Sequence, residues 1–135
     1  MLDRIDHVGV AVEDVDASLA LYRDALGLPL VHRETVAEQG VDAALFDVGD
    51  GHVELIAPLG PDTPVGKYLA RKGPGLHHVA YRVADIDAAL DALRGDGLRL
   101  IDAPPRLGIR RSRVAFVHPG AVGGVLTEIV QPEEH

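Results

Sequence analysis

Two stretches of this chain repeat one another, and this repeat constrains the fold more than any other feature of the sequence. Residues 7–23 read HVGVAVEDVDASLALYR, and residues 78–94, 71 positions later, read HVAYRVADIDAALDALR. Eight of the seventeen aligned positions are identical without a gap, including His7 with His78 and Asp14 with Asp85. Chance would give about one or two identities, so we interpret the chain as two copies of one structural unit.

Each copy opens with a strand pattern and continues with a helix pattern. In the first copy, alternation places Val8, Val10 and Val12 on one face of a strand and His7 on the other. Asp14 then stands where an N-cap carboxylate begins a helix whose apolar stripe, spaced by three and four residues, is formed by Val15, Leu19, Tyr22 and Leu26. The second copy repeats both patterns. We therefore expect the helices on one side of a sheet and both histidines on the other.

The remaining pattern predicts three more strands in each copy and thereby the fold class. The expected strands are 30–34, 41–48 and 52–57, then 99–102, 113–118 and 125–130. This gives an α+β fold in which two βαβββ repeats form a cupped, eight-stranded mixed sheet with helices on the outer face. We expect a single domain, 1–135, with repeat one at 1–57, a linker at 58–76, repeat two at 77–131 and a tail at 132–135. The linker should contain a short helix over 65–72, after Pro64. Residue Gln131 and the tail lack a strand or helix pattern.

Composition excludes several functional classes. The 135 residues contain 13 Lys and Arg against 21 Asp and Glu, a net charge of −8, and only 4% aromatic residues, which disfavours nucleic-acid binding. No apolar run approaches the roughly 18 to 20 residues of a membrane span, and the N-terminus lacks a signal-peptide pattern, so we expect a cytoplasmic protein. Because the chain has no cysteine, any metal must be held by histidine nitrogen and carboxylate oxygen.

Each repeat also places one glutamate in the middle of its last, otherwise apolar strand. These are Glu54 in VELI and Glu128 in TEIV, 47 residues after His7 and 50 after His78. Any one of the four alone is most simply an ordinary core or edge residue, but a buried glutamate is costly unless it is paired or binds a metal. The matching positions favour a site in which all four bind a divalent ion such as Co²⁺, Mn²⁺, Ni²⁺, Fe²⁺, Zn²⁺ or Mg²⁺.

Longer motifs carry a resemblance to a known family. They are IDHVGVAV (5–12), LYRDALGL (21–28), EQGV (38–41), VELIAPLG (53–60), DTPVGKYLARKGPGLHHVAYRV (62–83), RVAFVHP (113–119) and GGVLTEIVQ (123–131). Through them the chain resembles the vicinal oxygen chelate superfamily and, within it, the methylmalonyl-CoA epimerase family. The EQGV, GLHH and GGVLTE segments are the most specific to the epimerase branch.

The resemblance implies a function and a set of site residues. It implies an epimerase that interconverts (2R)- and (2S)-methylmalonyl-CoA by removing and returning the α-proton through a metal-stabilised enolate. The implied metal ligands are His7, Glu54, His78 and Glu128, and the first candidate for the ion is Co²⁺. His77 is implied to be a structural neighbour of the site and not a ligand. Glu128 is the first candidate for a catalytic base and Glu54 for the other. Further implications are an acyl-CoA substrate, a homodimer, and substrate contacts from Gln39, Lys67 and Arg113.

Two departures from the family pattern affect the site. Some members have a proposed second base three residues after the glycine of EQG, where this chain has Ala43, so Asp42 or a water are further candidates. Relatives commonly have HPK where this chain has Gly120 after His118 and Pro119. The basic residues that could instead contact CoA phosphates, or form a solvated basic surface, are Arg110, Arg111, Arg113, Lys67, Arg71 and Lys72.

Two other functions remain open at this point. The same scaffold supports glyoxalase-like enzymes and iron-dependent extradiol dioxygenases, although the latter generally use two histidines and one carboxylate, against four ligands here. A non-catalytic module that sequesters a small molecule would need no metal ligands.

Overall fold

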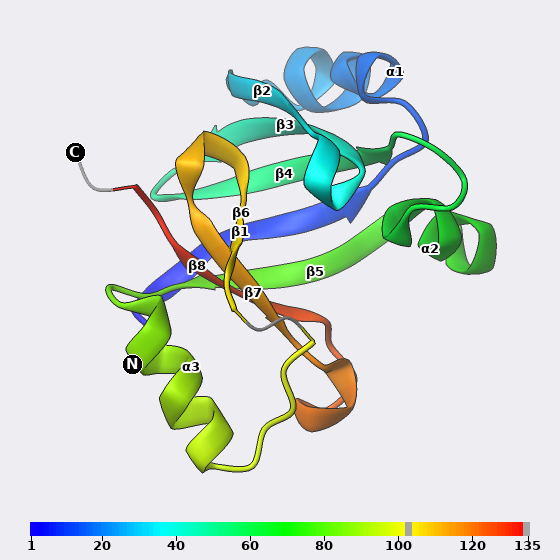
Figure 1. The fold of residues 1–135 in the computed structure, drawn as a ribbon. Helices are drawn as coiled ribbons and strands as arrows, with labels where there is room; N and C mark the ends of the chain where they lie inside the picture. Colours follow the sequence, from blue (N-terminus) through cyan, green and yellow to red (C-terminus); the bar gives the residue numbers. More distant parts are fainter. Residues whose placement is uncertain (102–103, 134–135) are drawn as a thin grey trace. The chain divides into compact units, whose positions relative to one another are not determined.

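A computed structural model describes residues 1–101 and 104–133, and its elements follow the predicted order (Figure 1). The first repeat contains β1 (Arg4–Ala11), α1 (Val15–Leu19), η1 (Ala20–Ala25), β2 (Leu30–Val36), η2 (Ala37–Gln39), β3 (Val41–Val48) and β4 (Gly51–Pro58). The helix α2 (Pro64–Lys72) follows. The second repeat contains β5 (Gly75–Arg82), α3 (Ile86–Gly95), β6 (Arg106–Leu107), η3 (Ile109–Arg111), β7 (Arg113–Val117), η4 (Pro119–Ala121) and β8 (Thr127–Gln131). The eight strands belong to one mixed sheet, which confirms the α+β class and the βαβββ repeats.

The chain divides into two compact units whose boundary falls inside β1. The first-repeat unit is Val8–His77, and the second-repeat unit combines Met1–His7 with His78–His135. The strand order is β2-β3-β4-β1 in the former and β1-β5-β8-β7-β6 in the latter. The opening residues of β1, including His7, therefore belong with the second repeat.

In the first-repeat unit, one face of the sheet packs against α1. Its core contains Val12, Val15, Leu19, Phe46 and Leu55, with Val10 partly buried beside them. The predicted N-cap is confirmed, since Asp14 accepts a hydrogen bond from the Asp16 amide. The predicted stripe fails at its end, because the helix continues as a π-helix over Ala20–Ala25 and Leu26 is 57% exposed. A wider helical turn rotates later residues away from a stripe drawn at 3.6 residues per turn.

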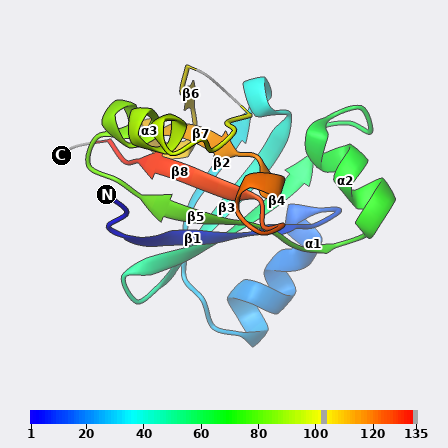
Figure 2. The same cartoon turned by 90° about the horizontal axis from the view of Figure 1, so that it is seen from below.

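In the second-repeat unit, α3 packs against the sheet in the same way. Ile86, Leu90 and Leu93 of α3 contact a core that includes Val117 and Ile129, and Asp85 caps the helix. The strands β5 and β8 are parallel neighbours, as Figure 2 shows, and β7 pairs with β8 antiparallel. The second face of this sheet carries the cluster Ala80, Val114 and Val130, together with the buried polar groups of the site.

Two local predictions in the second repeat are wrong. At 99–102, Leu100 makes only an isolated bridge to Val117, and the paired strand β6 comes later, at Arg106–Leu107. Pro104 and Pro105 between them have no N–H groups to extend a ladder; Asp102 lies outside the described residues. Gln131 belongs to β8, and its Oε1 accepts a hydrogen bond from the Ile86 amide at 2.9 Å.

The linker folds as predicted. The helix α2 begins after Thr63, whose side chain accepts a hydrogen bond from the Gly66 amide, and Pro64 occupies its first turn. None of the helices in the described part of the chain combines the length and apolar character required to cross a membrane.

Candidate metal centre

Three buried polar side chains of the second-repeat unit meet on the face of the sheet opposite α3. His7 comes from β1, His78 from β5 and Glu128 from β8, and their exposed fractions are 5%, 3% and 5%. The register places Glu128 beside Ala80 of β5 and Phe116 of β7, so it shares a face with His78. The Phe116 ring packs edge-on against His78, with ring centroids 5.7 Å apart. Three of the four predicted ligands are thus brought together.

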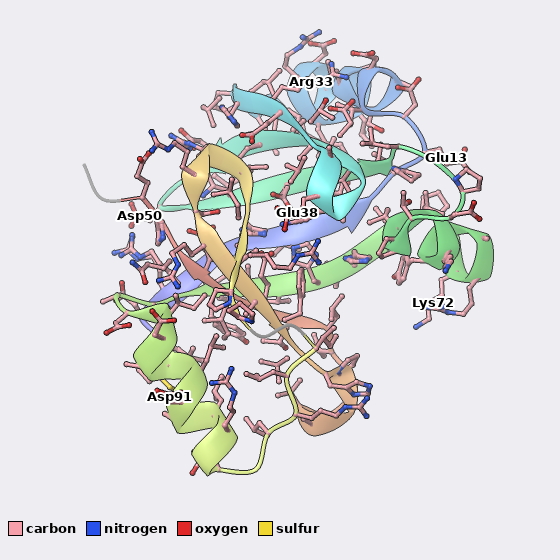
Figure 3. All side chains as sticks on the ribbon, viewed as in Figure 1. Glu13, Arg33, Glu38, Asp50, Lys72 and Asp91 are labelled. Atoms are coloured by element: carbon pink, nitrogen blue, oxygen red, sulfur yellow. The ribbon has the colours of Figure 1, made fainter. Side chains whose placement is uncertain are left out.

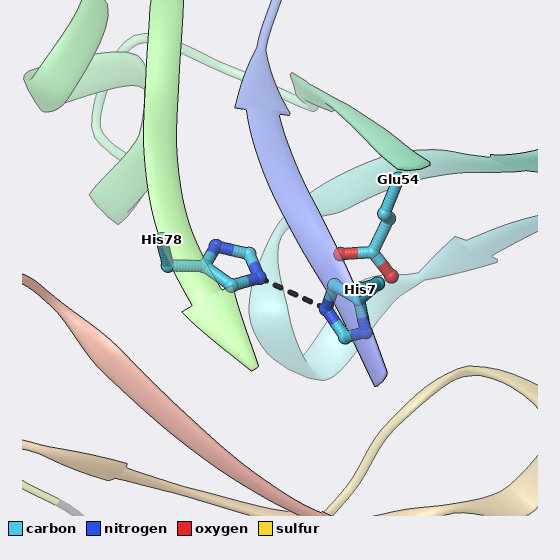
Figure 4. A group of neighbouring side chains, drawn as sticks. All are labelled: His7, Glu54 and His78. Atoms are coloured by element: carbon cyan, nitrogen blue, oxygen red, sulfur yellow. Dashed lines mark hydrogen bonds between the residues drawn. The ribbon is translucent and has the colours of Figure 1, made fainter. Parts of the chain in front are cut away.

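The ligand atoms of these three residues point at one another. The Nε2 atoms of His7 and His78 are 3.1 Å apart, as the dashed line in Figure 4 marks. Glu128 Oε1 lies 2.9 Å from Nε2 of His7 and 3.6 Å from Nε2 of His78. Bonds of about 2.1 Å to an octahedral divalent ion place neighbouring ligand atoms about 3.0 Å apart. The spacing of the three atoms fits such an ion.

The hydrogen bonding of these groups also favours a cation. His7 Nδ1 donates to Asp6 Oδ2 at 2.7 Å, which leaves the lone pair of Nε2 directed at Glu128. Glu128 Oε1 is correspondingly a buried oxygen without a hydrogen-bond partner among the described residues. Two acceptors held this close in a buried place repel one another unless a positive charge lies between them. The carboxylate–histidine pair is also the arrangement that orients metal-binding imidazoles in proteins.

The fourth predicted ligand, Glu54, lies in the first-repeat unit. It is on β4, 7% exposed and opposite Leu45 of β3, and alternation with Leu55 places it on the face away from α1. A buried carboxylate on an apolar strand needs a compensating partner. Glu54 therefore occupies in the first repeat the position that Glu128 occupies in the second: a buried carboxylate on the face of the sheet away from the helix.

His77, next to a predicted ligand, has a different environment. Its ring packs edge-on against Tyr68 of α2, with centroids 4.7 Å apart. Burial lowers the pKa of His77 to about 4, so the ring is neutral at pH 7. This agrees with its expected role as neighbouring structure.

The predicted substrate-binding residues lie in three different places. Gln39 ends η2, immediately before Gly40, whose φ of +70° makes the turn into β3. Lys67 is exposed on α2. Arg113 lies on the α3 side of its sheet, where its guanidinium donates to both oxygens of Asp87 at 3.1 and 3.2 Å. The register therefore turns Arg113 away from the face that carries His78.

Ala43 and its neighbour Asp42, a candidate base, lie on opposite faces of β3. Ala43 is 1% exposed and lies on the face that carries Glu54. Asp42 lies on the α1 side, where it accepts a hydrogen bond from Arg33 Nη2 at 2.9 Å. Arg33, labelled beside α1 in Figure 3, also donates to Asp16, and both carboxylates hold its pKa above the usual value. Asp42 therefore pairs with Arg33 and lies on the opposite face of the sheet from Glu54. It is not placed to transfer a proton near Glu54.

Sequence reasoning missed two residues of this region. Asp6 directly precedes His7, and a carboxylate next to a proposed histidine ligand could have indicated a hydrogen-bond partner for its imidazole. Arg106 pairs with Val114, which places it on the same face as His78 and Glu128. Its strand was predicted several residues too early, so its face could not be assigned from alternation.

Comparison with known proteins places this geometry in a family. Residues 6–116 match the model of the Glyoxalase/Bleomycin resistance protein/Dioxygenase superfamily. The chain belongs to this superfamily. Within it, the ethylmalonyl-CoA/methylmalonyl-CoA epimerase of Cereibacter sphaeroides is 35% identical over 97% of this chain and 99% of its own.

Solved structures agree with this superfamily assignment at higher identity. The methylmalonyl-CoA epimerase of Mycobacterium tuberculosis is 41% identical, with a TM-score of 0.95 over 98% of this chain and 90% of its own. A variant of the Streptomyces coelicolor methylmalonyl-CoA epimerase, solved with 2-nitronate-propionyl-CoA, is 41% identical, with a TM-score of 0.94 over 99% and 100%. The chain is thus an enzyme of the methylmalonyl-CoA epimerase branch of the superfamily.

Proposed function

We propose that this chain is a divalent-metal-dependent epimerase that interconverts (2R)- and (2S)-methylmalonyl-CoA. The observation that carries the proposal is the convergence of His7 Nε2, His78 Nε2 and Glu128 Oε1 in a buried place. It occurs in a chain that is 35% to 41% identical, over nearly its whole length, to proteins named as epimerases of this substrate. Convergent imidazoles and a carboxylate without a donor are what a divalent ion requires.

In this proposal, the ion is held by His7, Glu54, His78 and Glu128. Each of His7, Glu54 and His78 is buried and offers one ligand atom, and the repeat makes Glu54 the counterpart of Glu128. Two imidazoles and two carboxylates suit Co²⁺ first, with Mn²⁺, Ni²⁺, Zn²⁺ or Mg²⁺ as alternatives. When bound, such an ion supplies Lewis-acid stabilisation of the negative charge that develops on the substrate's oxygens.

The proton chemistry belongs to the carboxylates of the chain. Inversion at C2 requires one group that removes the α-proton and another that delivers a proton on the opposite side of the planar carbon. We assign the first role to Glu128, a buried carboxylate on the same face as His78. Glu54 is the other carboxylate that the sequence proposes, but a carboxylate that shares its charge with a cation is a weaker base.

The substrate class in this proposal is an acyl-CoA thioester. Gln39 and the exposed ammonium of Lys67 are the proposed contacts, whereas Arg113 would have to give up its ion pair with Asp87. A homodimer and a cytoplasmic location remain predictions from the sequence and the resemblance.

The proposal is tested by following each pure epimer of methylmalonyl-CoA with the purified, metal-loaded protein in D₂O. We expect the opposite epimer to form and deuterium to appear at C2, because the proton returned comes from a group that exchanges with solvent. Tight binding of the thioester without either change would instead support a sequestering module.

Asp6 provides a further test of the metal site. Because Asp6 fixes the His7 tautomer from a distance of 2.7 Å, we expect Asp6→Asn to weaken metal affinity by about 10- to 100-fold. Calorimetric titration with Co²⁺ measures the change. The matched control is Asp3→Asn. Asp3 precedes β1 and pairs with Arg82, the last residue of β5, and these two strands carry His7 and His78. Equal Co²⁺ affinity of Asp6→Asn and the wild type would remove Asp6 from the site.

A further inference from the structure

An imidazole–carboxylate pair lies on the same face of the first-repeat unit as Glu54. His32 Nε2 and Glu34 Oε1 on β2 are 2.8 Å apart, and their side chains are 32% and 36% exposed. Neither residue belongs to the proposed ligand set. Both can exchange protons with solvent, unlike the buried Glu54.

The strand register fixes where this pair lies. Glu34 is directly opposite Ala43 of β3, and His32 is opposite Leu45. Leu45 is in turn opposite Glu54 of β4, and Ala43 is opposite Ile56. Residues directly opposite one another share a face, so His32, Leu45 and Glu54 form one row across three strands. Neighbouring strands are about 4.8 Å apart, which separates the backbones of His32 and Glu54 by roughly 10 Å.

The surface between the pair and Glu54 is apolar. Leu45 and Ala43 are 4% and 1% exposed, and the alanine adds little bulk beside Glu34. A substrate that reaches an ion held by Glu54 would lie over this surface.

We propose that Glu34, hydrogen-bonded to His32, is the second proton-transfer group of the enzyme. This inference rests on the proposed epimerase function. The C2–H bond breaks, its electron pair remains in the substrate and is shared with the thioester oxygen, and the proton passes to the Glu34 carboxylate. Inversion then requires a proton on the opposite side of C2, and the proposed function assigns its delivery to Glu128, which takes that proton from solvent before the substrate binds. The cycle is completed when His32 passes the proton of Glu34 to water and Glu128 takes up another. The reverse reaction uses the same groups in reverse order.

The test measures α-proton exchange in D₂O separately for each epimer, by NMR, with metal content checked for every variant. In Glu34→Gln we expect exchange from one epimer, and epimerisation, to fall by at least about 100-fold, while the other epimer still exchanges through Glu128. The double variant Glu34→Gln with Ala43→Glu returns a carboxylate to the same place from the opposite strand. The double variant should regain exchange. If Glu34→Gln had lost exchange through a folding defect, the second substitution would not restore it.

The matched control is His52→Asn. His52 on β4 pairs with Asp47 on β3 at 3.1 Å and shares the face, but it lies beside the β3–β4 turn. We expect this control to exchange both epimers at the wild-type rate. The inference is overturned if Glu34→Gln exchanges both epimers within about threefold of wild type, or if metal-loaded Glu54→Gln or His52→Asn shows the one-sided loss instead. If the wild-type protein neither exchanges nor epimerises, the proposed function itself fails.

Discussion

Replacing His78 by alanine should remove bound metal and epimerase activity together. His78 is 3% exposed and supplies one of three ligand atoms that lie 2.9 to 3.6 Å from one another. Changes in the surroundings of a ligand already cost about 10- to 100-fold in affinity, so loss of a ligand should cost more than about 100-fold. Metal content after gel filtration and the rate of epimerisation measure the two effects.

The matched control for this variant is its neighbour. His77→Ala removes the same kind of side chain from the adjacent position of β5, but its ring packs on Tyr68 instead of meeting His7. We expect His77→Ala to keep its metal. A His78→Ala protein with normal metal content would show that the ligand set is wrong.

A metal-loaded Glu128→Gln protein should lose epimerisation by about 10²- to 10⁴-fold, the usual contribution of a positioned acid or base. Glutamine keeps an oxygen that can bind the ion, but it cannot accept the α-proton at neutral pH. Exchange from one epimer should survive, because the group on the other side of C2 is unchanged. NMR of each pure epimer in D₂O separates exchange from epimerisation.

The matched variant for Glu128 is Glu54→Gln. It changes the corresponding glutamate of the other repeat, and it should be milder if Glu54 serves mainly as a ligand. Near wild-type epimerisation by metal-loaded Glu128→Gln would remove Glu128 from proton transfer.

The repeat explains why so much of the site could be predicted from the sequence. A 71-residue offset relates His7 to His78, and alternation on a strand then assigns both to the face without helices. The face of each histidine depends only on the two-residue period of its strand. An error of one residue in where the strand begins or ends does not change that face. The structure confirms the predicted strands other than 99–102, together with both N-caps and the linker helix.

What the sequence could not predict depends on contacts between distant segments. In the sequence, Arg113 and Asp42 are charged residues with no evident partner. In the structure Arg113 pairs with Asp87 on the face that α3 covers, and Asp42 pairs with Arg33 on the face that α1 covers. The row that joins His32 to Glu54 depends on the register of three strands and on an irregularity between Leu30 and His32. Alternation within a single strand contains no information about register.

The most direct test of the central claim is epimerisation by protein from which metal has been removed with a chelator and then restored. We expect the chelated protein to lose activity and to regain it in proportion to bound Co²⁺, reaching its maximum at one ion per chain. His78→Ala should show no recovery under the same titration. Full epimerase activity in protein shown to be free of metal would contradict the account.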